Sequence, residues 1–91
     1  RYVDLRRANL SHADLQEAKL NDADLTVADL SGPTLAFAAL ENADLEGTSL
    51  VAANLTRIDL LAAESIKGAC FHRAALDDTT LATDQLAGAI G

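Results

Sequence analysis

The chain has 91 residues and a formal net charge of −7, with twice as many acidic as basic side chains. Phosphate contacts need clustered Lys and Arg, so we expect no nucleic-acid partner. No apolar run approaches the roughly 18 residues of a membrane helix, and no signal-peptide pattern is present, so we expect no membrane partner. The single cysteine permits no internal disulfide, which favours a reducing, cytoplasmic location.

Leucine recurs at every fifth position over the first two thirds of the chain. Alanine usually stands two residues before each leucine, and Asp or Asn usually stands between them. The repeating unit therefore reads A-(D/N)-L-x-x, and after one slip it continues with other large apolar residues. The predicted structural core comprises Leu5, Leu10, Leu15, Leu20, Leu25, Leu30, Leu35, Leu40, Leu45, Leu50, Leu55, Leu60, Ile66, Phe71, Leu76 and Leu81.

A period of five fits neither a helix nor a flat strand. Each helical residue turns by about 100°, which would scatter the leucines around the axis. Side chains alternate along a strand, so an odd spacing would flip every second leucine to the other face. The pattern works if the chain turns a corner once per repeat, with alanine and leucine pointing inward and the residue between them outward. Four corners close a coil of about twenty residues, and coils would stack at about 4.8 Å.

Six repeats resemble those of the pentapeptide-repeat family: A-N-L at 8–10 and 53–55, and A-D-L at 13–15, 23–25, 28–30 and 43–45. Members of that family fold as right-handed, four-sided parallel β-helices. The resemblance covers residues 2–86 and implies an all-β solenoid, a right-handed quadrilateral parallel β-helix of about four coils. It is specific for the fold and says little about function.

The repeat pattern predicts a β-helix over residues 1–81, with a register slip near 61–63. The extra residue there is interpreted as a corner bulge, or else as a small projecting loop. Residues 82–91 hold better helix formers and resemble the helical tails of many pentapeptide arrays, so we expect a short C-terminal helical cap. The chain contains no methionine and starts in register, which suggests that it is part of a longer protein.

Residues twenty apart should stack, so the outward positions should form columns along the four sides. Several acids gather on one edge, which either remains solvated with its Asp side chains bonded to nearby backbone N–H groups, or docks on a basic partner. Phe37 should be exposed at a corner between Glu17 and Arg57, where it is a candidate contact. The candidate acidic docking edge comprises Asp4, Asp22, Asp24, Glu41, Asp44 and Glu46.

The residues that could carry metal or nucleophilic chemistry are His12, Cys70 and His72. His12 should lie three coil steps from the other two, on the order of 14 Å, whereas zinc ligands sit about 2 Å from the metal. Cys70 with His72 resembles a nucleophile and base, but no third group orients them. The chain also lacks a Gly-rich phosphate loop and an H-E-x-x-H motif. We therefore predict no enzyme activity, no metal and no cofactor.

These observations favour a non-catalytic protein-interaction or scaffold module, part of a larger protein. Its expected partner is a protein of unknown identity, and the acidic surface would suit a basic one. The family resemblance adds an alternative, because some members are acidic DNA mimics that occupy the DNA-binding saddle of bacterial DNA gyrase. Such mimics are roughly twice as long as this chain and dimerise through a coil end. A homodimer through a coil end is therefore also an expectation, although residues 86–91 lack aromatic side chains for such a seam.

Overall fold

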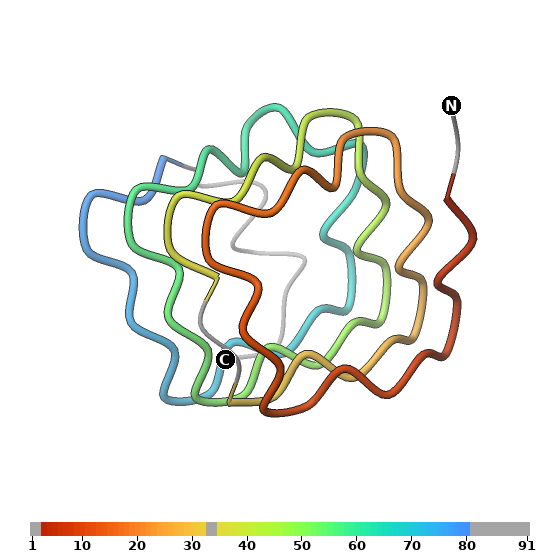
Figure 1. The fold of residues 1–91 in the computed structure, drawn as a ribbon, viewed down its shortest axis with the longest axis horizontal. Coiled ribbons are helices and arrows are strands. Elements are labelled where there is room, and N and C mark those ends of the chain that lie inside the picture. Colours follow the sequence, from red (N-terminus) through yellow and green to blue (C-terminus); the bar gives the residue numbers. More distant parts are fainter. Residues whose placement is uncertain (1–2, 33–34, 81–91) are drawn as a thin grey trace.

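The computed structural model describes residues 3–32 and 35–80. Within these ranges there is no helix and no extended strand, and the secondary structure consists of single-residue β-bridges separated by two-residue turns. The chain winds into stacked coils, each lying beside the one before it (Figure 1). All the bridges are parallel, as in the pairs of Asp24 with Asp4 and with Asp44. The predicted helical cap over 82–91 lies outside the described residues.

Each corner is a β-turn that begins at the repeat leucine. The carbonyl of Leu5, for example, accepts the N–H of Ala8 at 3.0 Å. The third turn residue has a positive φ, 61° at Arg7, except at Ala62 beside the register slip, and glycine holds this place at Gly32, Gly47 and Gly68. A positive φ at this position is the mark of a type II turn, and it explains why glycine recurs at the corners.

The outward Asp or Asn of the repeat fastens the corner that follows it. Its Oδ1 accepts the N–H of the residue two positions on, at 3.1 Å from Asp24 to Thr26 and from Asn54 to Thr56. In both pairs the threonine hydroxyl adds a second bond of 2.6 Å to the same oxygen. Such local bonds are the reason that Asp and Asn favour turns. The same N–H contact is made to Asp4, Asn9, Asp14, Asp29, Asp44 and Asp59.

The core is a ladder of inward leucines that is most deeply buried in the middle coils. The four leucines of the first coil pack against this ladder but are only partly buried, because a described coil covers them on one side only. Leu76 departs from the prediction, since 38% of its surface is exposed. Leu76 lies in the last coil that the structure describes, and the neighbours described for that coil all belong to earlier coils. Leucines with at most 2% exposure are Leu25, Leu30, Leu35, Leu40, Leu45, Leu50, Leu55 and Leu60.

The register slip is a β-bulge that lies slightly beyond its predicted place near 61–63. Ala63 keeps the inward alanine position and Ile66 takes the inward leucine position, and both are buried. Two residues, Glu64 and Ser65, therefore stand between them where other repeats have one. Both keep backbone hydrogen bonds of 2.8 Å to the preceding coil. The bulge thus absorbs the extra residue without breaking the stack.

Candidate acidic docking site

Columns of outward side chains run along the coils in the predicted register. Asp4, Asp24 and Asp44 form consecutive bridges, and the column continues to Ser65 after the bulge. The column of Asn9, Asp29, Ser49 and Cys70 is confirmed at every step. On the third side the bridges confirm the step from Asn54 to Ala75, and on the fourth side the steps from Lys19 to Ala39 and from Asp59 to Thr80. Thr34 of the third column lies outside the described residues. The confirmed pairs of these columns are Asn9–Asp29, Asp29–Ser49, Ser49–Cys70, Asn54–Ala75, Lys19–Ala39 and Asp59–Thr80.

A pocket opens beside the aspartate column, at the corner that precedes it. Its volume is about 190 Å³, and four of its lining residues are carboxylates contributed by successive coils. Asn42 adds an amide to the lining, and Ala23 forms part of its wall. We call this hollow the acidic pocket; it is lined by Asp22, Ala23, Asp24, Asn42, Asp44 and Glu64.

Hydrogen bonds to the backbone orient the two aspartates of the acidic pocket that belong to the column. Oδ1 of Asp24 is held by Thr26, and Oδ1 of Asp44 accepts the N–H of Glu46 at 3.0 Å. In each carboxylate, one oxygen is therefore occupied by the hydrogen bonds of its own corner. The second oxygen of Asp44 has no hydrogen-bond partner within the described ranges, and that of Asp24 lies 3.8 Å from Nε of Arg6. These second oxygens can accept hydrogen bonds from a partner.

Glu64 is the carboxylate of the acidic pocket that sequence reasoning missed; Asn42 and Ala23 were also not on the predicted docking edge. Glu64 is the additional residue of the bulge, and its N–H bonds the carbonyl of Ala43 at 2.8 Å. In a regular repeat one residue would follow the inward alanine before the next inward side chain. The register slip was the signal that could have found Glu64, because an inserted residue on this side lands next to the aspartate column.

Three acids of the predicted docking edge lie outside the lining of the acidic pocket. Glu41 and Glu46 do not line it. Asp4 forms an ion pair with Arg6, with Oδ2 and Nη2 2.8 Å apart. The side-chain hydrogen bond from Arg6, supported by its N–H, lowers the pKa of Asp4 to about 2. The predicted docking edge is therefore reduced to the acids that line the pocket, and Arg6 partly neutralises the negative charge of the edge on the first coil.

The carboxylates of the acidic pocket are not arranged as a metal site. Across residues 3–32 and 35–80, no group of three or more His, Cys, Asp or Glu side chains is arranged to hold a metal. Like charges about 5 Å apart repel by roughly 1 kcal/mol in water and by more near a protein surface. An ammonium or guanidinium group entering the pocket would relieve this repulsion and could bond the second oxygen of Asp44.

The structure places His12 in a different coil from Cys70 and His72, the other residues considered for metal or nucleophilic chemistry. His12 lies on the first coil, where its Nδ1 is 2.9 Å from the place that a Cβ on Gly32 would occupy. Cys70 lies in a later coil, where it is bridged to Ser49, and His72 stands at the exposed corner that follows Cys70.

In the described part of the chain, no helix is long and apolar enough to cross a bilayer.

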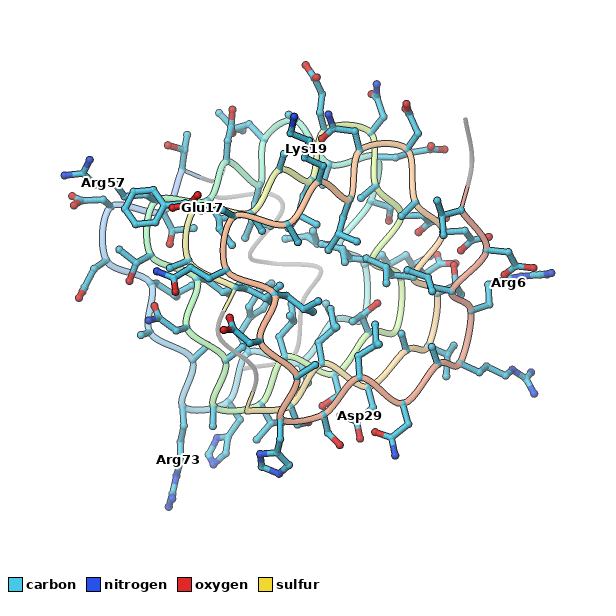
Figure 2. The ribbon with its side chains drawn as sticks, viewed as in Figure 1. Arg6, Glu17, Lys19, Asp29, Arg57 and Arg73 are labelled. Carbon is cyan, nitrogen blue, oxygen red and sulfur yellow. The ribbon has the colours of Figure 1, made fainter. Side chains whose placement is uncertain are left out.

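Phe37 lies at its corner with the neighbours predicted for it. Its ring is 49% exposed, and Cζ of Arg57 lies 5.6 Å from the ring centroid. Glu17 donates its backbone N–H to the carbonyl of Ala36 at 3.0 Å, which places Glu17 on the other side of Phe37. Arg57 also lies 3.9 Å from Asp78, so one corner carries an ordered series of charged and aromatic side chains. Glu17 and Arg57 lie on the same edge of the molecule in Figure 2.

Comparison with known proteins identifies the family. A family model described as pentapeptide repeats matches residues 1–32 and 28–60, with eight copies. A search of curated protein sequences finds no match to this chain. The crystal structure of Rfr23, a pentapeptide repeat protein from the cyanobacterium Cyanothece 51142, is 31% identical with a TM-score of 0.80, and the match covers 98% of this chain and 55% of that one.

A second solved structure is HetL, a pentapeptide repeat protein involved in heterocyst differentiation regulation from the cyanobacterium Nostoc sp. strain PCC 7120. It is 30% identical, has a TM-score of 0.34, and the match covers 86% of this chain and 38% of that one. The present chain thus spans about half of the Rfr23 chain and less of HetL. The chain belongs to the pentapeptide-repeat family, and its fold is accordingly the right-handed quadrilateral β-helix of that family.

Proposed function

We propose that the chain is a non-catalytic protein-interaction module that docks a basic surface of another protein through the acidic pocket. The observation that carries this proposal is the cluster of four carboxylates on successive coils around one hollow. The interior of the coil is filled by leucines with at most 2% exposure, which leaves little room there for a substrate. Function is therefore expected on the outer surface, where backbone ladders hold side chains in fixed places.

The chemistry of the acidic pocket suits an arginine or lysine side chain. A guanidinium group offers five N–H donors in a planar fork, and carboxylates are the acceptors that match it. The oxygens of Asp24 and Asp44 that are not bonded at their corners can only accept hydrogen bonds. They therefore favour a group that only donates them, such as a guanidinium or an ammonium. A basic protein segment with Arg or Lys at its centre is the partner class that this surface fits.

Binding of an arginine-containing peptide tests this proposal. A fluorescent peptide with one central Arg and neutral flanks is titrated with the whole chain and with Asp22→Asn/Glu64→Gln. The matched control is Glu41→Gln/Glu46→Gln, which removes the same two charges outside the acidic pocket. We expect the pocket variant to weaken binding by roughly tenfold and the control to change it little. Equal losses in the two variants would show that only net charge attracts the peptide.

The second candidate function is a DNA mimic that binds DNA gyrase, and the column of Asp4, Asp24 and Asp44 is the observation that favours it. Carboxylates one coil apart give about one charge per 4.8 Å on this side, compared with one per 1.7 Å of duplex axis. The column ends in Ser65, and Arg6 neutralises its start. Purified gyrase subunits would bind the wild-type chain in competition with DNA, and Asp24→Lys/Asp44→Lys would abolish that binding.

A further inference from the structure

The corner that carries Phe37 and the side that follows it have a charge order that complements itself. Along the corner, Glu17, Phe37 and Arg57 occupy three successive coils, so their order is negative, aromatic, positive, and Asp78 follows Arg57 on the next coil. Along the adjoining side, Lys19 is bridged to Ala39, and Asp59 takes the same place one coil later. The order there is positive, small, negative, which is the reverse of the corner. The two columns therefore have opposite charge orders, and each has an uncharged residue, Phe37 or Ala39, on the second coil.

Such an order is self-complementary when two copies lie side by side and antiparallel. A two-fold axis perpendicular to the coil axis at the level of Phe37 places that ring opposite its counterpart. The same rotation puts Glu17 opposite Arg57 of the second copy, and Lys19 opposite Asp59 of the second copy. Each of these contacts occurs twice, as an isologous interface requires. Four opposite-charge pairs would therefore flank one aromatic contact.

We propose that this surface binds a second copy of the chain and forms an antiparallel, side-by-side dimer centred on Phe37. The two-fold surface is defined by Glu17, Lys19, Phe37, Ala39, Arg57 and Asp59. Charge complementarity commits it to a second copy, because a partner with one sign of charge would meet a repulsive group in each column. Exposed aromatic and Arg side chains are also enriched in binding hot spots.

The state of the individual side chains agrees with this use of the surface. Phe37 stands at a corner with 49% of its surface exposed. Glu17 and Lys19 have no ion-pair partner within residues 3–32 and 35–80. Arg57 lies over the Phe37 ring and makes a 3.9 Å contact with Asp78, and the side chains of Arg57 and Asp78 are both largely exposed. The charges of the two-fold surface are therefore available to another molecule.

The dimer would leave the acidic pocket open. The acidic pocket lies at the corner beyond the side that carries Lys19 and Asp59, and none of its residues belongs to the two-fold surface. Because the two-fold axis runs perpendicular to the coil axis, both pockets would face the same side of the dimer. Two docking sites for basic segments on one side would allow bivalent binding. The dimer itself does not depend on the proposed function of the acidic pocket.

Sedimentation equilibrium over a wide range of concentrations tests the dimer, with variants that reverse one charge. Arg57→Glu places two acids opposite each other at both ends, and Glu17→Arg does the same with two bases. We expect each variant alone, and Phe37→Ser, to weaken dimerisation by at least roughly tenfold. An equimolar mixture of Arg57→Glu and Glu17→Arg should dimerise again, because each chain then faces opposite charges. Circular dichroism melting curves verify that every variant folds.

The outcomes separate this dimer from other forms of association. Both mixed chains keep a net negative charge, so general attraction between them cannot produce the recovery. A wild-type chain that is monomeric at the highest concentration would overturn the proposal. So would a wild-type dimer that survives Arg57→Glu or Phe37→Ser, which is the result expected for association through a coil end. A mixture of the two charge variants that remains monomeric would disprove the pairing of Glu17 with Arg57.

Discussion

The hydroxyl of Thr48 donates a hydrogen bond of 2.7 Å to the carbonyl oxygen of Leu25, which lies one coil earlier. Thr48 is fully buried and takes the inward place that alanine holds in most other repeats. The same carbonyl also accepts the N–H of Ala28 at 2.9 Å, so it closes a corner and joins two coils. A buried hydroxyl with a partner of this kind adds to the stability of the stack.

Thr48→Val should lower the free energy of unfolding by about 0.5–1.5 kcal/mol, because it keeps the shape of the side chain and removes the hydrogen bond. Urea denaturation followed by circular dichroism measures the change. Thr48→Ser is the matched control, since it keeps the hydroxyl and deletes the methyl group. A valine variant as stable as the wild type would show that the bond between Thr48 and Leu25 contributes nothing.

Leu25→Asp should unfold the chain cooperatively. Leu25 is completely buried in the middle of the leucine ladder, and an aspartate there would place an unpaired charge among apolar side chains. Circular dichroism at 25 °C and a thermal melt give the readout. Leu76→Asp is the control, because Leu76 is 38% exposed and a charge there can reach water. A Leu25→Asp variant that melts like the wild type would disprove the inward leucine ladder.

Val27→Asn should stabilise the chain by about 1 kcal/mol. Val27 is exposed and has a φ of 61°, a left-handed conformation that is costly for β-branched residues and that Asn tolerates. Val51→Asn is the matched control, since Val51 stands at a corner without a positive φ. Differential scanning calorimetry compares the two melting temperatures. If both variants shift alike, the backbone conformation of Val27 is not the source of the gain.

The ion pair between Asp4 and Arg6 should make a part of the stability depend on pH. The folded-state pKa of Asp4 is about 2, below the usual 3.8 of an unfolded aspartate. The contribution is therefore fully present above about pH 4 and is lost as the pH falls through 2. Hydrogen bonds from the side chain and N–H of Ser31 shift the pKa of Asp29 in the same direction.

Denaturation of the wild type and of Asp4→Asn between pH 2 and 6 measures this contribution. The difference in free energy of unfolding should shrink as the pH falls, and added salt should reduce it because the pair is exposed. A difference that stays constant across this range would contradict the assigned pKa of Asp4.

Much of the fold follows from the sequence because its repeat is short and local. Alanine and leucine two apart must share one side of a short straight segment, and the Asp or Asn between them bonds the next corner, as Asp24 does to Thr26. The stacking of Asp4, Asp24 and Asp44 then follows from counting residues, and the bridges confirm it.

The acidic pocket could be predicted only in part. Asp22, Asp24 and Asp44 were on the predicted docking edge, whereas Glu64 was not, because its position depends on which residue of the slip bulges outward. That choice is made by the hydrogen bond of Glu64 to Ala43 in the preceding coil, which no local pattern reveals. The withdrawal of Asp4 from the site also depends on how the Arg6 side chain folds back on it.

The sequence by itself determined the period and the inward and outward positions, since each depends on neighbours within one five-residue unit, and counting four units per coil then predicted the register of the columns. The tertiary structure decided where the bulge lies, which acids surround a common hollow, and that Leu76 stays exposed. These features arise from contacts between coils about twenty residues apart, where packing and charge act between side chains that the chain brings together only after it has wound.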